Sequence, residues 1–384
     1  MQTSLSPFMD IAALVKAVGL FSNRLLFVAR APSLTERETP VRANNPDVDA
    51  ISHWRYRRIN DALGPASGRF FGDGYRKVDQ LLHHVSVGAD PVGNPLIRGT
   101  VTLRYPEDWS VKSGSTELRP HLSSIDAAVF AVQLAEYYLI QGLGLDAAQC
   151  RTAWVRSMQM WAGSRPQLEL ADIGVEARVV ESYALPRSLC GQVTVMECRI
   201  GGFRVRYEVE HESARDAASA GVALSEAGEV RTAFGYYGDG FKRVQREIEH
   251  LRADPEFGSI EALVSVTDPG HGAGREGLGG DYLPALSPID AIVVVAQLCQ
   301  VLLYGMDKVD RQESGTLWMR RISFEAKTPY QPIDNPFVAT TSTVKSRISD
   351  MGGKRWRSAE LQSRLLGVRG TCALTHALPE AANR

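Results

Sequence analysis

The sequence predicts an α+β fold made of two tandem copies of one unit, each with a long helix buried against an antiparallel sheet. Three observations predict it: a nine-residue string that recurs, two matching apolar segments of helix length, and several β-rich runs after the helix. Self-similarity at a fixed period is the signature of a repeated unit. The chain is therefore organised around a duplication.

The recurring string begins each copy. It reads FFGDGYRKV at 70–78 and YYGDGFKRV at 236–244, so every position is identical or chemically equivalent at an offset of 166 residues. We expect each Gly-Asp-Gly centre to be a turn whose glycines adopt positive φ. The chain then divides into four parts. An N-terminal extension and linker covers 1–68, and repeat 1 covers 69–212. A linker rich in Ala, Ser, Gly and Glu covers 213–232, and repeat 2 covers 233–384.

One long helix is predicted in the middle of each copy, over 123–142 and 287–304. Each segment begins with a serine three residues before an aspartate, which is the spacing of a capping box, and Pro288 suits a first helical turn. Both segments are apolar on nearly every side, which predicts that they are buried rather than lying on the surface.

Strands are predicted on both sides of the helix in the sequence. In repeat 1 an extended segment and a strand over 97–105 precede it, and β-rich or alternating runs follow at 152–158, 174–180, 192–200 and 203–209. A helix buried beneath a mainly antiparallel sheet, with two strands before it and several after, is the arrangement called a hotdog. Two fused copies predict a double hotdog, with both sheets running together.

Bulk composition excludes several classes of protein. The 43 Lys and Arg nearly balance the 44 Asp and Glu, so no long-range field favours a nucleic-acid or membrane partner. Lys16 and Arg24 interrupt the apolar stretch over 11–29, so it falls short of the ~18–20 uninterrupted apolar residues that a membrane span requires. Five cysteines without a CxxC pair indicate a reducing compartment. We predict a cytoplasmic protein without metal or cofactor, and leave a homodimer open.

Two aspartates are candidate catalytic groups. Asp126 and Asp290 lie one turn into the predicted helices, near the positive end of the helix dipole, and could act as general acid or base. The alternative is that each carboxylate only caps its helix.

Two histidines are also candidates. His121 could exchange protons near neutral pH at the start of the first helix, whereas the equivalent position in repeat 2 is Ala285. The alternative is an exposed loop histidine. His84 aligns with His250 on an extended segment. The difference between His121 and Ala285 predicts two unequal pockets where the repeats meet, with the active one at the first helix. We expect the glycine-rich stretch 270–280 to be a lid over the start of the second helix.

The candidate substrate-binding residues are one glutamine on each helix and a Trp–Arg pair on the strand after it: Gln133, Gln297, Trp154, Arg156, Trp318 and Arg320. The glutamines return to the helical face of the aspartates and could hold a substrate carbonyl, or else bond to the backbone. Each Trp–Arg pair occupies alternate strand positions on one face. An aromatic ring beside a guanidinium could hold a phosphate or carboxylate, or else Trp packs on the helix and Arg pairs with an acid.

Five strings resemble those of the avirulence-D (AvrD) family: FFGDGY at 70–75, RPHLSSID at 119–126, ECRIG at 197–201, SPIDAIVV at 287–294 and MGGKRWR at 351–357. That family is linked to syringolide-type compounds, in which a β-ketoacyl chain is joined to a pentulose and cyclised to a lactone. The resemblance implies an enzyme of acyl transfer or condensation and cyclisation. Its partners would be a β-ketoacyl thioester, on an acyl carrier or coenzyme A, and a small hydroxyketone sugar such as xylulose.

A weaker resemblance is to double-hotdog dehydratases, whose acid lies near the start of a buried helix. In those enzymes Gln or His follows the carboxylate four residues on, whereas here the glutamines follow seven residues on. A hotdog dehydratase or thioesterase acting on acyl thioesters, and a noncatalytic acyl-lipid binding module, are therefore the alternatives.

Overall fold

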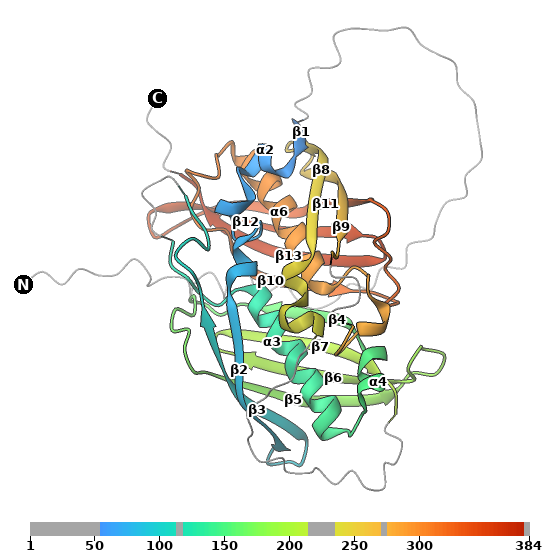
Figure 1. Ribbon diagram of the computed structural model, residues 1–384. Coiled ribbons are helices and arrows are strands. Elements are labelled where there is room, and N and C mark those ends of the chain that lie inside the picture. Colours follow the sequence, from blue (N-terminus) through green and yellow to red (C-terminus); the bar gives the residue numbers. More distant parts are fainter. Residues whose placement is uncertain (1–53, 113–117, 214–234, 270–274, 380–384) are drawn as a thin grey trace, which may run out of the picture.

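The protein is described by a computed structural model that covers residues 54–112, 118–213, 235–269 and 275–379. Within these residues thirteen strands form one sheet in the order β1-β8-β9-β11-β12-β13-β10-β4-β7-β6-β5-β3-β2 (Figure 1). The strands are β1 Trp54–Arg58, β2 Asp79–Ala89, β3 Pro95–Arg104, β4 Trp154–Trp161, β5 Ile173–Ala184, β6 Gln192–Ile200, β7 Phe203–His211, β8 Gln245–Asp254, β9 Ser259–Thr267, β10 Trp318–Glu325, β11 Phe337–Met351, β12 Lys354–Leu365 and β13 Val368–Ala377.

The duplication is visible in the strand order. Repeat 1 runs β2-β3-β5-β6-β7-β4 and repeat 2 runs β8-β9-β11-β12-β13-β10, which is the same topology. The halves join where β4 and β10 pair antiparallel, with Met160 opposite Ile322. The α+β class, with a helix buried against an antiparallel sheet in each repeat, is confirmed. One expected strand begins later than predicted, because Thr152 ends a short helix before β4.

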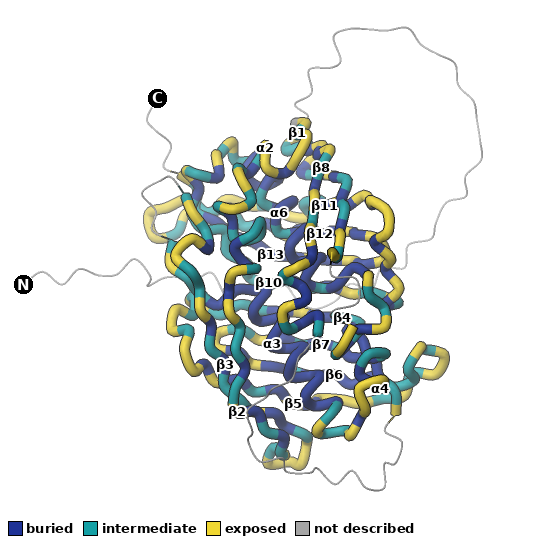
Figure 2. The backbone as a smooth tube through the Cα atoms, in the orientation of Figure 1, coloured by how far each residue is buried: buried dark blue, intermediate teal, exposed yellow. Residues whose placement is uncertain are grey.

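Two long helices form the centre of the fold. The helices are α2 Ile59–Leu63, α3 Ser124–Tyr137 with a π-helical turn Tyr138–Gly142, α4 Ala147–Thr152, α5 Phe241–Arg243 and α6 Pro288–Asp307. Every residue of α3 is buried, and Figure 2 shows the chain darkest where the helices meet the sheet. Among the described residues, α6 is the one helix whose length and composition would suit a membrane span, and 83% of that window is buried inside the protein.

Each repeat is held by the helix of the other. Gln133 on α3 donates from Nε2 to the carbonyl of Tyr237 at 2.8 Å, in the recurring string of repeat 2. In return Arg69, next to the string of repeat 1, donates from Nη1 to Oε1 of Gln297 on α6 at 2.5 Å. The rings of Tyr75 and Phe241 stack 6.3 Å apart. The two strings therefore meet around the pseudo-twofold axis between the repeats.

The glycines of the recurring string serve a different purpose from the one predicted. Gly72 and Gly74 are not among the glycines with positive φ, so that expectation was wrong. A Cβ atom on Gly74 would lie 1.8 Å from the carbonyl oxygen of Trp109, and one on Gly72 would lie 2.3 Å from that of Ala66. Glycine is required because the backbones approach closely.

Part of the predicted N-terminal linker is ordered structure. Strand β1 pairs antiparallel with β8, and α2 contacts α6 through a face that buries Ile59 and Leu63. This segment covers the outer edge of β8, which would otherwise present unpaired backbone groups. The apolar stretch over 11–29 and nearly all of the linker 213–232 lie outside the described residues.

The helix aspartates differ in their partners, which predicts different costs of removing their charge. Asp290 accepts from Nε of Arg246 at 2.7 Å, and both side chains are almost fully buried. Asp126 accepts from uncharged groups, Nε2 of Gln80 at 2.9 Å and the hydroxyl of Tyr105.

Asp290→Asn should therefore lower the free energy of unfolding by about 3–5 kcal/mol, because it leaves a buried guanidinium without its carboxylate. Asp126→Asn should cost about 1–2 kcal/mol. Urea unfolding of both variants measures the difference, and equal losses would contradict it.

Candidate functional site

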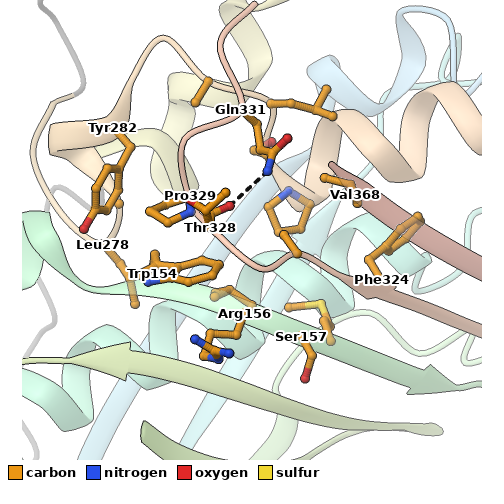
Figure 3. A pocket seen from close by; sticks show the side chains of 18 of the residues that line it. Trp154, Arg156, Ser157, Leu278, Tyr282, Phe324, Thr328, Pro329, Gln331 and Val368 are labelled. Carbon is orange, nitrogen blue, oxygen red and sulfur yellow. Dashed lines mark hydrogen bonds between the residues drawn. The ribbon is translucent and has the colours of Figure 1, made fainter. Parts of the chain in front are cut away.

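Two cavities occupy equivalent places at the starts of the two long helices. The larger, about 650 Å³, lies at the start of α3, and the smaller, about 80 Å³, lies at the start of α6 (Figure 3). Each takes the helix start from one repeat and the Trp–Arg strand from the other. The matched lining pairs are Phe70 and Tyr236, Phe71 and Tyr237, Ser123 and Ser287, His121 and Ala285, Trp318 and Trp154, and Arg320 and Arg156. Small-molecule sites typically measure ~300–1,000 Å³, so only the larger cavity has that size.

One side of the smaller cavity is formed by a segment that bonds to repeat 1. The amide of Leu278 donates to Oε2 of Glu136 on α3 at 2.9 Å, and the hydroxyl of Tyr282 donates to the carbonyl of Thr152 at 2.7 Å. Figure 3 shows Leu278 and Tyr282 on one side of this cavity, with Trp154 beside them. On α6 the position equivalent to Glu136 is Gln300, which lines the larger cavity. The lid expected over 270–280 stays a prediction: Leu278 and Gly279 line the smaller cavity, and residues 270–274 lie outside the described part.

An apolar wall forms one side of the larger cavity. Helix α6 contributes Ile292, Val295, Ala296 and Cys299, and strands β10, β12 and β13 contribute Ile322, Trp356, Cys372 and Leu374. The thiols of Cys299 and Cys372 lie 3.6 Å apart in this wall, and their contact, together with burial, raises the pKa of Cys299. A mostly apolar concave surface of this size suits an acyl chain.

Cationic side chains line the rest of the larger cavity. They are Arg69, Lys112, Arg119, Arg165, Arg311 and Arg320, and among the described lining residues there is no Asp or Glu. A cavity with this charge favours an anionic ligand.

Arg320 shows how the two cavities differ in charge. Its equivalent, Arg156, pairs with the buried carboxylate of Glu210 in the opposite strand. Trp154 lies opposite Glu210 in β7, whereas Trp318 lies opposite Thr375 in β13, so Arg320 has no carboxylate at that position. Arg320 donates instead to the carbonyl of Gly163 at 2.9 Å, and burial lowers its pKa. The charge of Arg320 is therefore available to a ligand.

His121 lies in the larger cavity, where its ring packs near Trp109 and Trp318 with centroid distances of 6.0 and 5.4 Å. Its Nδ1 lies 2.9 Å from the carbonyl oxygen of Arg119. Because a carbonyl oxygen only accepts, this contact assigns the proton to Nδ1 and leaves a lone pair on Nε2 of the neutral ring. The geometry thus presents His121 as a proton acceptor.

Asp126 and Asp290 line neither of the two cavities at the helix starts. Oδ2 of Asp126 accepts from the amide and hydroxyl of Ser123, at 3.0 and 2.7 Å, and the capping box is complete in both helices. Both aspartates thus have the contacts of the capping alternative.

The remaining candidates lie elsewhere. Gln133 binds the recurring string of repeat 2, and Gln297 binds Arg69 beside the string of repeat 1 and lines a third cavity of about 190 Å³. His84 is exposed in a bulge of β2 with φ 51°, and His250 has φ 52° in the matching bulge of β8. Histidine is among the residues that accept positive φ most readily, so the backbone accounts for the shared position.

Three cavity residues, Arg69, Lys112 and Arg311, were not found by the sequence analysis. A signal was present, since Gly235 stands opposite Arg69 at the offset of 166 and Ala147 opposite Arg311 at the offset of 164. As with His121, a functional residue stands out where the repeats differ.

A scan against protein families matches residues 54–379 to the family described as Pseudomonas avirulence D protein (AvrD). The chain belongs to the AvrD family. The resemblance drawn from the five strings is thereby confirmed. No curated protein matches this AvrD-family chain.

Several solved structures are similar to this AvrD-family protein. A putative thioesterase from Novosphingobium aromaticivorans has 10% identity and a TM-score of 0.31, with 79% of this chain and 95% of that chain covered. The dehydratase domain of PpsC from Mycobacterium tuberculosis, in complex with C12:1-CoA, has 10% identity and a TM-score of 0.36, with 76% and 97% covered. A protein of unknown function with a hot dog fold from Alicyclobacillus acidocaldarius has 10% identity and a TM-score of 0.33, with 77% and 96% covered.

Glu136 predicts a pH dependence of stability. Burial raises its pKa from 4.5 to about 7, while the amide of Leu278 lowers it. The folded protein therefore binds more protons than the unfolded chain between these values, so stability falls as pH rises through them.

Glu136→Gln should remove this dependence, because glutamine cannot ionise. Relative to the variant, the wild type should lose about 2–3 kcal/mol of unfolding free energy between pH 5 and 8. Urea unfolding across that range measures it, with the exposed Glu247→Gln as control. Parallel curves for wild type and Glu136→Gln would contradict the prediction.

Proposed function

We propose that this AvrD-family protein is an enzyme that joins a β-ketoacyl thioester to a hydroxyketone sugar in the larger cavity and promotes closure of a lactone. The observation that carries the proposal is the composition of that cavity, which combines an apolar wall on α6, cations and a histidine. The wall would hold the acyl chain, and the polar part would hold the thioester head and the sugar.

The tandem repeats support a double-hotdog interpretation of the fold. In both repeats one long helix packs against an antiparallel sheet with the same strand order, and β4 pairs with β10 to continue the sheet. On this interpretation the two cavities are the paired pockets of a hotdog dimer, now in one chain. We place the reaction in the cytoplasm on the basis of the reduced cysteines.

His121 is the proposed base of the first step. The sugar hydroxyl oxygen attacks the thioester carbonyl carbon, so a C–O bond forms and the C–S bond breaks. Nε2 of His121 takes the hydroxyl proton and returns it to the departing thiolate. Arg320, Arg119 and Arg165 are the cations that could balance the charge that develops on the carbonyl oxygen.

Ring closure follows from the chemistry of the first product. The carbon between the two carbonyls of a β-ketoester is acidic, so it can attack the sugar's ketone carbon when the esterified hydroxyl is next to that ketone. The new C–C bond closes a five-membered lactone, and loss of water leaves a double bond in the ring. His121, now neutral again, could remove the acidic proton.

The test is to incubate the purified full chain with a β-ketoacyl thioester and a hydroxyketone sugar and to follow products by mass spectrometry. An acylated sugar or its lactone supports the proposal. Water loss or free acid without any sugar adduct would favour the dehydratase or thioesterase alternative, and unchanged substrates bound with measurable affinity would favour the binding module.

His121→Ala should lower the turnover number by about 10²- to 10⁴-fold, because a positioned proton acceptor is lost. The melting temperature should stay within a few degrees, since the side chain is not fully buried. His84→Ala, at the exposed bulge, is the matched control and should keep its rate. If both variants behave alike, His121 is not the base.

Ala296→Phe should shorten the acyl chain that the enzyme accepts, because a ring at this position on α6 takes up cavity space next to the apolar wall. Competition between short and long acyl thioesters measures the change, and the short substrate serves as the internal control. Unchanged selectivity would place the chain outside this wall.

A further inference from the structure

Three cations of the larger cavity form a cluster where the repeats meet, here called the basic cluster: Arg69, Lys112 and Arg311. Nη2 of Arg311 donates to the carbonyl of Gly68, the residue before Arg69, at 2.9 Å. Nζ of Lys112 donates to the carbonyl of Ser314 at 2.7 Å. Repeat 1 thus supplies two of the cations, and the segment after α6 supplies the third.

Within the described part of the chain, the hydrogen bonds that these three groups donate go to uncharged acceptors. Arg69 donates to Oε1 of Gln297 and Oδ1 of Asn60, both at 2.5 Å, and Arg311 also reaches the carbonyl of Val111 at 3.4 Å. Carbonyl and amide oxygens orient a cation without neutralising it. Part of the cluster's positive charge is therefore left for a ligand.

The cations also oppose one another. Burial lowers the pKa of Arg69 to about 10 and that of Lys112 to about 8, and the charge of Arg311 contributes to both shifts. Asp73 raises the pKa of Arg69 and Asp310 raises that of Arg311, but neither aspartate lines the larger cavity. Like charges held together in a partly buried place favour an anion between them.

Of the two equivalent cavities, only the larger is lined by the basic cluster, of which Arg69 also lines the third cavity. At the repeat offsets, the positions equivalent to Arg69, Lys112 and Arg311 are Gly235, Glu276 and Ala147. The smaller cavity therefore lacks all three cations. A feature needed only for folding would be expected on both sides of the pseudo-twofold axis, so its presence at one side points to a ligand.

The geometry points to a phosphate-binding subsite at the basic cluster, which takes the phosphomonoester of a substrate. A phosphomonoester carries close to two negative charges near pH 7 and three acceptor oxygens, which matches a cluster of three cations better than a carboxylate does. This inference rests on the proposed function and narrows it, because the phosphate belongs either to a phosphorylated ketopentose or to the coenzyme A of the thioester.

Calorimetric binding to the full chain, without turnover, tests the subsite and separates the two sources. One arm compares xylulose 5-phosphate with xylulose, and the other compares coenzyme A with its 3′-dephospho form. We expect the phosphorylated member of one pair to bind at least 10-fold more tightly. Because no reaction is needed, a chain that binds phosphate but forms no acyl sugar would leave this inference standing and sink the proposed function.

Variants complete the test. Arg311→Gln and Lys112→Gln should each reduce the phosphate preference by about 10-fold or more, and the less buried Lys112 provides the result if Arg311→Gln fails to fold. Arg252→Gln is the control, since Arg252 is exposed and pairs with Glu261.

A phosphate preference in the sugar arm assigns the subsite to the sugar, and one in the coenzyme arm assigns it to the thioester. Equal binding within both pairs, or a preference that survives in the cluster variants, would overturn the inference.

Discussion

The fold depends on the exchange of contacts between the two repeats at the pseudo-twofold axis. The amide of Gln133 holds the string of repeat 2, and Gln297 accepts from Arg69 beside the string of repeat 1. All of these groups are away from water, where an unpaired polar group costs about 1–3 kcal/mol. In each helix one amide atom of the glutamine, Nε2 of Gln133 and Oε1 of Gln297, finds its partner in the other repeat. The exchange therefore fixes how the halves meet, and with it the position of both cavities.

The sequence predicted those parts of the fold that depend on local pattern and internal comparison. The strings at 70–78 and 236–244 revealed the duplication, the serine–aspartate spacing marked both helix starts, and β6 has the predicted bounds. The role of Gly74 could not be predicted, because it depends on the carbonyl of Trp109, which is distant in the sequence. For the same reason β1 was missed, since its partner β8 lies about 190 residues away.

The candidate site could be predicted only where the repeats differ. His121 was recognised because Ala285 stands in its place, and the structure puts His121 in the larger cavity. Asp126 and Asp290 are shared by both repeats, and the completed capping boxes explain why such positions are kept. The different environments of Arg156 and Arg320 could not be predicted from the sequence. They arise because strand pairing places Glu210 opposite Trp154 but Thr375 opposite Trp318.

The composite origin of each cavity has an evolutionary consequence. In a symmetric homodimer, any substitution in the gene changes both sites at once, so neither site can be lost while the other is kept. In a fused chain the start of α3 and the Trp–Arg strand β10 belong to one cavity, and the start of α6 and β4 belong to the other. A substitution in one repeat, such as the one that made the equivalent positions His121 and Ala285 different, then alters a single site. In such a chain one cavity can shrink, to about 80 Å³ at the start of α6, while the other stays at about 650 Å³.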